Sequence, residues 1–243
     1  MVAATRHEHF EAVSRLQEEI WGSGAVAAPS TLVQVLGRAG GVVLLALAQG
    51  SPIGFVYGFV GRNHQGVLYH RSHAAGVLPQ FRGRGVARRL KLAQRRAALA
   101  QGLDRMVWTF DPAQVGNAYF NLHRLGATAR AFKADYYGQR PDALNHGLPT
   151  DRLVAEWFLA EGAQRQLAAL RRAPQARLTV PAGLPQRDED PPEVARGPQR
   201  RLRSGLEQSL ALGLAAIDFD RPSRTYLWAR LPMSFPEPAE PVD

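Results

Sequence analysis

A glycine-rich turn between an expected strand and an expected helix is the feature of this sequence that most clearly indicates chemistry. Its residues are Gly76-Val-Leu-Pro-Gln-Phe-Arg-Gly-Arg-Gly-Val-Ala87. Glycines let backbone amides approach a ligand closely, and the first amides of a helix have no acceptor within the helix. Because the helix dipole is also positive at this end, we expect the turn to bind a pyrophosphate.

The spacing of the glycines excludes two other phosphate-binding loops. A dinucleotide fingerprint needs Gly-x-Gly-x-x-Gly, and a Walker loop needs Gly-Lys followed by Ser or Thr; residues 76–87 contain neither. A tight turn whose arginines are merely solvated is the alternative interpretation. The order of strand, proline, arginine, paired glycines and amphipathic helix favours phosphate binding.

The elements that position this turn follow from hydrophobic spacing. Residues 9–21 and a segment beginning at Pro29 carry apolar side chains at helical intervals. Strands are predicted where branched and aromatic side chains concentrate, at residues 41–48, 53–60 and 67–77.

The helix after the turn has two faces. Val86 and Leu90 begin an apolar face. The residues that mark a polar face are Arg84, Arg88, Lys91 and Arg95. A strand at 105–110, a helix at 114–125 and a strand at 127–137 complete a βαβαβ order, which favours an α/β or α+β layered domain.

The rest of the chain has its own order of elements. It reads as a strand at 153–159, a polar helix, a strand at 177–180, an acidic proline-rich loop at 186–198, a helix from Pro198, and a strand pair at 215–219 and 225–231. The tail from Pro232 has too many prolines to pack. We therefore expect a domain at 1–150, an extension at 151–231 and a disordered tail at 232–243.

Composition restricts the partners. The chain has 243 residues, a formal charge of +9 and no cysteine, so it has no disulfide or thiolate metal site. No apolar run is long enough to cross a membrane, and a cytoplasmic location is expected. The arginines are spread along the chain without interleaved exposed aromatics, which argues against nucleic-acid binding.

The turn resembles the signature of the GNAT superfamily of acyl-CoA-dependent N-acyltransferases, Val-x-Pro-x-x-Arg-Gly-x-Gly-x-Gly/Ala. The matching residues are Val77, Pro79, Arg82, Gly83, Gly85 and Ala87, with Arg84 between the glycines. Segments at 90–95, 108–112, 117–121 and 147–152 are similar to a narrower GNAT-like family with a C-terminal extension. The resemblance implies a mixed, mostly antiparallel central sheet flanked by helices, followed by a smaller α+β extension.

The resemblance also implies a co-substrate, acetyl-CoA or another acyl-CoA, and no metal. Backbone groups near Gly76 would pair with the pantetheine arm, and the amides of residues 82–87 would hold the pyrophosphate. The implied cofactor-binding residues are Gly76, Val77, Leu78, Arg82, Gly83, Arg84, Gly85, Val86, Ala87, Arg88 and Asn117. For Arg84 and Arg88, a solvated helix face is the alternative.

An amine acceptor must lose a proton before it attacks a thioester, so a base near neutral pKa is expected. His70 and His73 lie on the strand beside the expected thioester. Their offset of three places them on opposite faces unless a bulge intervenes. His73 is the preferred base because it is nearer to Val77, and a histidine hydrogen-bonded within the sheet is the alternative.

Two further catalytic candidates follow the next strand. Asp111 would lie beside the cofactor cleft, although Asp before Pro is also common in turns and helix caps. Many superfamily members protonate the leaving thiolate with a tyrosine four residues before the glycine that ends this helix, where this chain has Leu122. Tyr119 lies one turn earlier and is a candidate substitute, and a role in the core is its alternative. The other candidates are a water or a polar side chain on the same helix, namely Asn117, Asn121 or His123.

The function expected from these residues is transfer of an acyl group to a small amine. The main alternative is a non-catalytic acyl-CoA-binding or regulatory protein, which the leucine at 122 favours. A third hypothesis is a basic RNA-associated protein. The C-terminal strands are expected to extend or cap the first sheet and shape the acceptor side, with a homodimer contact as their alternative role.

Overall fold

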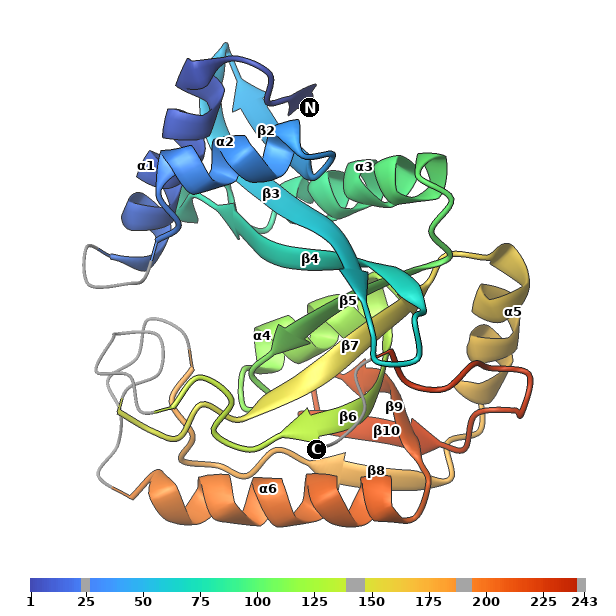
Figure 1. Cartoon of the computed structure of the whole chain (residues 1–243). Coiled ribbons are helices and arrows are strands. Elements are labelled where there is room, and N and C mark those ends of the chain that lie inside the picture. Colours follow the sequence, from blue (N-terminus) through green and yellow to red (C-terminus); the bar gives the residue numbers. More distant parts are fainter. Residues whose placement is uncertain (23–26, 139–146, 187–193, 240–243) are drawn as a thin grey trace. The chain divides into compact units, whose positions relative to one another are not determined.

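The computed structural model describes residues 1–22, 27–138, 147–186 and 194–239. The chain forms two compact units, one of residues 1–106 and one of residues 107–243. Both contain helices packed on antiparallel strands (Figure 1). The α+β fold class expected from the sequence is therefore confirmed. Within the described ranges, no helix is long and apolar enough to cross a membrane.

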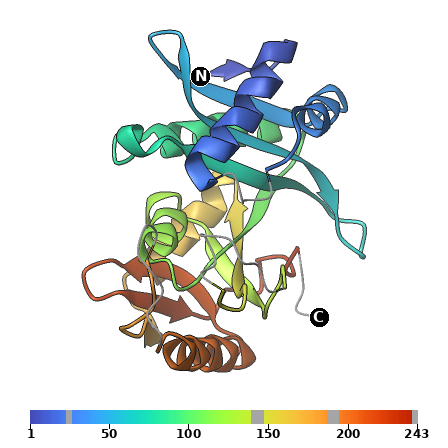
Figure 2. The same ribbon diagram turned by 90° about the vertical axis from the view of Figure 1, so that its left-hand side faces the viewer.

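Unit 1 is an antiparallel sheet with helices on both faces. Its strands lie in the order β1 (Val2–Ala3), β2 (Val42–Ala48), β3 (Ser51–Arg62), β4 (Leu68–Val77). Its helices are α1 (His7–Trp21), α2 (Ser30–Arg38) and α3 (Val86–Ala100), and a 3₁₀ turn, η1 (Pro79–Phe81), leads from β4 toward α3. Figure 2 shows α1 crossing one face of this sheet.

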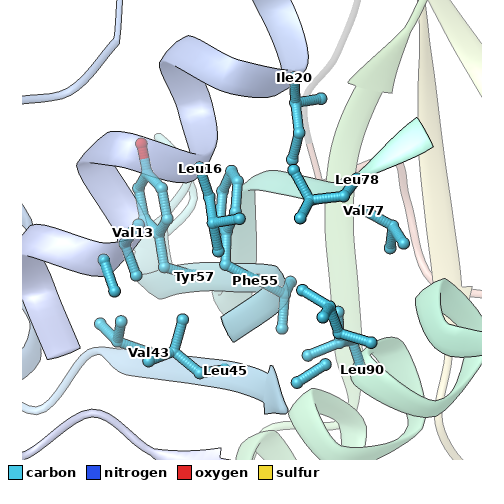
Figure 3. Packing of buried hydrophobic residues seen from close by; sticks show 14 of the residues in the cluster. Val13, Leu16, Ile20, Val43, Leu45, Phe55, Tyr57, Val77, Leu78 and Leu90 are labelled. Atoms are coloured by element: carbon cyan, nitrogen blue, oxygen red, sulfur yellow. The ribbon is translucent and has the colours of Figure 1, made fainter. Parts of the chain in front are cut away.

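The two faces of β3 explain how the helices are held. Phe55 and Tyr57 point toward Val13 and Leu16 of α1 (Figure 3). The Tyr57 hydroxyl donates to Gln17 Oε1 at 3.4 Å. The next residue, Gly58, faces α3, because a Cβ there would lie 3.0 Å from Gln94 Nε2. Alternation along the strand thus gives α1 one face and α3 the other.

Unit 2 carries the remaining strands in the order β5-β7-β6-β9-β10-β8. These are β5 (Arg105–Phe110), which begins at the end of unit 1, β6 (Thr128–Lys133), β7 (Arg152–Phe158), β8 (Ala176–Thr179), β9 (Ala215–Asp220) and β10 (Thr225–Ala229). Its helices are α4 (Val115–Ala118), the π-helix η2 (Tyr119–Arg124), α5 (Glu161–Leu170) and α6 (Arg196–Ala211).

The C-terminal strands β9, β10 and β8 extend the sheet beyond β6. The sequence predicted that they either extend or cap a sheet, and the structure shows extension. β9 pairs with β6 through Ala129 and Ala216, and β10 pairs with both β9 and β8. The compact units do not follow the expected boundaries at 150 and 231. Those boundaries concern where a family domain ends, and they stay a prediction.

Several element ends differ from the sequence-based expectation. The helix expected at 114–125 becomes a π-helix after Ala118, since the Leu125 amide reaches back five residues to the Phe120 carbonyl at 3.0 Å. The strand expected to reach 137 ends at Lys133. Helix α6 begins at Arg196, two residues before the expected start, and residues 187–193 of the expected acidic loop lie outside the described residues.

The expectation that the tail does not pack is wrong for residues 235–239. Phe235 meets Phe158 edge to face, with ring centroids 5.0 Å apart. The Ala239 amide donates to Glu156 Oε1 at 2.7 Å, and Arg130 Nη1 donates to the Pro236 carbonyl at 2.7 Å. Prolines prevent a helix or strand here, but they do not prevent hydrogen bonds to a buried carboxylate.

Candidate active site

The turn between β4 and α3 places two left-handed glycines just before the first amides of a helix. Gly83 and Gly85 both have φ of +75°, a left-handed conformation that glycine adopts without strain. A Cβ on either would meet nothing within 4 Å, so backbone conformation and not space favours glycine. Gly85 caps α3 without a side-chain hydrogen bond, and the first turn of α3 has no acidic residue. Its amides are therefore open to an anion.

The arginines of the loop have different surroundings. Arg82 Nε donates to the Val77 carbonyl at 3.3 Å, so its guanidinium supports the end of β4. Arg84 is exposed and lies over the ring of Phe81, 5.6 Å from its centroid. Arg88, one turn further, is also exposed. Exposure fits both interpretations of Arg84 and Arg88, whose role at the phosphates stays a prediction.

Strand β4 contains a bulge at His73. Tyr57 of β3 is opposite Ala74, whereas the next residue, Gly58, is opposite Ser72. His73 is therefore the extra residue, and such a bulge bends the strand and interrupts its ladder. Backbone groups released from pairing are available to a ligand that adds to the strand.

His70 and His73 lie on opposite faces of β4, as expected. The His73 ring lies 5.4 Å from Tyr57 and 6.1 Å from Phe59 by ring centroids, on the side of α1. His70 Nε2 lies on the side of α3, near Gly58. Although His73 reaches solvent, packing removes part of its water shell and lowers its pKa below 6.5, and the charge of Arg71 lowers the pKa further. His73 is thus mostly neutral at pH 7 and able to accept a proton.

The expectation that Lys91 belongs to a polar helix face is wrong. Lys91 is only 3% exposed and forms a polar cluster with His70, Ser72 and Gln94 between β4 and α3. Sequence reasoning missed this cluster. One feature of the sequence could have indicated that Lys91 is buried: it directly follows Leu90 and so lies at the edge of the apolar face of the helix.

The buried His70 makes stability depend on pH. Burial first and Lys91 second lower the pKa of His70 from 6.5 to about 4. The unfolded chain therefore binds more protons between these values, and stability present above pH 6.5 is lost as pH falls toward 4. We expect a loss of about 2 kcal/mol between pH 7 and 5 from this group. Urea unfolding at the two pH values should show a smaller loss in His70→Gln than in the parent, and an equal loss would contradict the assignment.

Asp111 of unit 2 stabilises a turn, which was the alternative interpretation of this residue. Its Oδ1 accepts from the Ala113 amide at 2.8 Å, and its carbonyl accepts from the Gln114 amide at 3.2 Å. These bonds form the turn between β5 and α4. A catalytic role for Asp111 stays a prediction beside this one.

Tyr119 takes part in a ring stack and is not in the core. Its ring lies 4.8 Å from His123 and nearly parallel to it, and the Arg221 guanidinium lies 5.8 Å from its centroid. His123 Nδ1 lies 3.0 Å from Asp218 Oδ1 on β9. Leu122 is fully buried, and Asn117 is exposed. Asp218 is a partner that local sequence patterns could not indicate, because it lies far along the chain.

The candidate residues divide between the two units. His73, the end of β4 and the glycine loop belong to unit 1, whereas Asp111, Asn117 and Tyr119 belong to unit 2. The roles of individual residues in cofactor binding and catalysis stay predictions.

Comparisons with known proteins found a matching family model and several similar folds. Residues 8–126 match the family model described as Acetyltransferase (GNAT) family. No curated protein sequence matches the chain. Among solved structures, yncA of Salmonella typhimurium with acetyl-CoA is 17% identical, with 66% of this chain and 96% of that chain covered and a TM-score of 0.52.

Two other solved structures contain bisubstrate analogues. Chaetomium thermophilum Naa20 is 15% identical, with 65% of this chain and 86% of that chain covered and a TM-score of 0.52. Arabidopsis thaliana Naa50 with CoA-Ac-MVNAL is 15% identical, with 63% and 93% covered and a TM-score of 0.50. At these identities the comparison shows a shared fold.

Proposed function

Since the chain carries a GNAT acetyltransferase domain over residues 8–126, we propose that it transfers an acyl group, most simply acetyl from acetyl-CoA, to a small amine. The observation that supports acyl-CoA binding most directly is the uncapped first turn of α3 behind two left-handed glycines. Backbone amides at a helix start bind a pyrophosphate, and coenzyme A contains one.

The proposed reaction is direct attack of the amine on the thioester. The amine nitrogen bonds to the carbonyl carbon, the carbon–sulfur bond breaks, and CoA leaves as the thiolate. His73 accepts the proton that the amine loses, because an imidazole with a lowered pKa is neutral at pH 7 and has an unprotonated acceptor nitrogen. A backbone N–H of β4 would polarise the thioester carbonyl, and the bulge at His73 supplies backbone free of the regular ladder.

The residues of unit 2 complete the proposal. Tyr119 is proposed to return a proton to the thiolate in place of the tyrosine that Leu122 replaces, and Asn117 to contact the cofactor. Asp111 is proposed to act near the acceptor. Arg84 and Arg88 are proposed to add positive charge for the nucleotide phosphates.

The second candidate function is a non-catalytic acyl-CoA binder. Two observations favour it: Leu122 is fully buried, and Asp111 is already engaged in the β5–α4 turn. Such a protein would use the same glycine loop, so only turnover separates the two functions.

Thiol release from acetyl-CoA across a panel of amines tests the proposal. We expect turnover with at least one amine, and His73→Ala should lower kcat by about 10²–10⁴-fold while the Kd for CoA changes little, because a general base acts on the acceptor. His64→Ala is the matched control, since His64 is an exposed histidine in the turn between β3 and β4. CoA binding without turnover would favour the non-catalytic function, and no CoA binding would exclude both.

A further inference from the structure

A buried polar cluster joins α3 to β4 inside unit 1. His70 and Ser72 of β4 are 0% and 4% exposed, and Lys91 and Gln94 of α3 are 3% and 0% exposed. Lys91 Nζ donates to Ser72 Oγ at 2.8 Å, and Ser72 Oγ donates to Gln94 Oε1 at 2.8 Å. Lys91 Nζ also lies 3.5 Å from Gln94 Oε1. The Ser72 hydroxyl therefore connects the strand to the helix through two hydrogen bonds.

The opposite strand leaves room for this cluster. A Cβ at Gly58 of β3 would lie 2.6 Å from His70 Nε2 and 3.0 Å from Gln94 Nε2. It would also lie 2.3 Å from the Arg71 carbonyl. A side chain at 58 would therefore collide with the backbone of β4 and with two members of the cluster.

The cluster is costly for an interior position. Burial lowers the pKa of Lys91 well below its usual range, because an ammonium loses its water shell there. Within the described part of the chain, both ring nitrogens of His70 and Gln94 Nε2 have no hydrogen-bond partner. Apolar residues of similar volume would fill such a space at lower cost. The cluster is thus poorly explained by stability alone.

Its position suggests what it does. Ser72 directly precedes the bulge residue His73, and the part of β4 proposed to pair with the pantetheine arm begins three residues further on, at Gly76. Lys91 lies in the second turn of α3, directly after the first-turn amides proposed to hold the pyrophosphate. The Lys91–Ser72 hydrogen bond therefore joins the two elements that are proposed to hold the two ends of one ligand.

We propose that Lys91 is a positioning residue for acyl-CoA, and that its hydrogen bond to Ser72 sets the spacing between the bulged β4 and the start of α3. This inference rests on the proposed acyl-CoA function. A ligand that engages both elements needs them at one separation, whereas a ligand that engages only the α3 loop does not. The contribution of Lys91 is accordingly specific to the complete cofactor.

The test compares two ligands by calorimetry. One is CoA, and the other is adenosine 3′-phosphate 5′-diphosphate, which is CoA without its pantetheine arm. In Lys91→Met we expect the Kd for CoA to rise at least about tenfold and the Kd for the shorter ligand to stay within about twofold. Methionine keeps the length of the side chain, and the midpoint of urea unfolding should not fall, because an apolar side chain is better suited to the interior.

Two further variants complete the test. Arg96→Met on the exposed side of α3 is the matched control, and it should bind both ligands as the parent does. Ser72→Ala should repeat the selective loss for CoA, and its loss should be at least that of Lys91→Met, because it also removes the hydrogen bond from Ser72 to Gln94. The double variant should lose no more than Ser72→Ala alone, since Ser72→Ala already removes the bond that Lys91 makes to the strand. If Lys91→Met does not fold, Ser72→Ala still tests whether the Lys91–Ser72 hydrogen bond contributes to CoA binding.

The outcomes separate this inference from the proposed function. If the parent binds neither ligand, the proposed function fails and the inference with it. If the parent binds CoA and Lys91→Met binds it equally well, only the positioning role is wrong. Equal weakening of both ligands would also overturn it, because loss of a positive charge or disturbance of the loop would act on the phosphates that the two ligands share.

Discussion

Replacing Gly83 with glutamate is expected to weaken CoA binding by at least about a hundredfold, which corresponds to about 2.7 kcal/mol. Gly83 has φ of +75°, where a residue with a side chain costs about 1–2 kcal/mol. The new carboxylate would also stand beside the open amides of α3 and repel the pyrophosphate from them. Calorimetry with CoA measures the effect directly.

Gly102 provides a matched control at the other end of α3. It has φ of +76°, and a Cβ there would also meet nothing within 4 Å. Gly102→Glu therefore introduces the same strain and the same charge away from the proposed phosphate site. It should lose similar stability and keep the parent affinity for CoA. Equal CoA affinities in the two variants would show that the glycine loop is not the phosphate site.

The second large effect concerns a buried ion pair in unit 2. Arg130→Met is expected to lower the free energy of unfolding by about 3–5 kcal/mol, because it leaves a buried carboxylate without its cation. Arg130 Nε donates to Glu156 Oε2 at 2.7 Å, and the Glu156 side chain is 2% exposed. The loss of the bond from Arg130 to the Pro236 carbonyl should also release the tail. Urea unfolding monitors the first effect, and limited proteolysis the second.

An exposed ion pair on α5 is the control for this prediction. Arg165 and Glu161 lie 3.7 Å apart with side chains 76% and 86% exposed, so Arg165→Met should change stability by less than about 1 kcal/mol. Replacing both Arg130 and Glu156 with methionine should recover much of the loss, because no uncompensated charge remains. A double replacement as unstable as the single one would mean that packing, and not the charge, dominates at this site.

The glycine loop and most elements could be predicted from sequence because their causes are local. Gly83 and Gly85 are spaced for a left-handed turn, and Val86 and Leu90 continue a helical stripe directly afterwards. Strand and helix patterns depend on the same short-range periodicity, so β5 was predicted at its observed bounds. The turn chemistry of Asp111 was likewise visible as Asp before Pro.

The bulge at His73, the burial of Lys91 and the packed tail could not be predicted in the same way. Each depends on a partner distant in sequence: Tyr57 and Gly58 for the bulge, Ser72 for Lys91, and Glu156 for Ala239. A lysine beside an apolar stripe has no local feature that separates a buried from a solvated position.

The sequence by itself therefore determined the glycine-rich turn, the α+β class and the order of most elements, because backbone conformation and side-chain periodicity are properties of neighbouring residues. Only the tertiary structure decided which faces of β4 carry His70 and His73 and which polar groups lie inside. It also decided that Asp218 meets His123 on η2. Strand register and burial are set by contacts between distant segments, and those contacts exist only once the chain has folded.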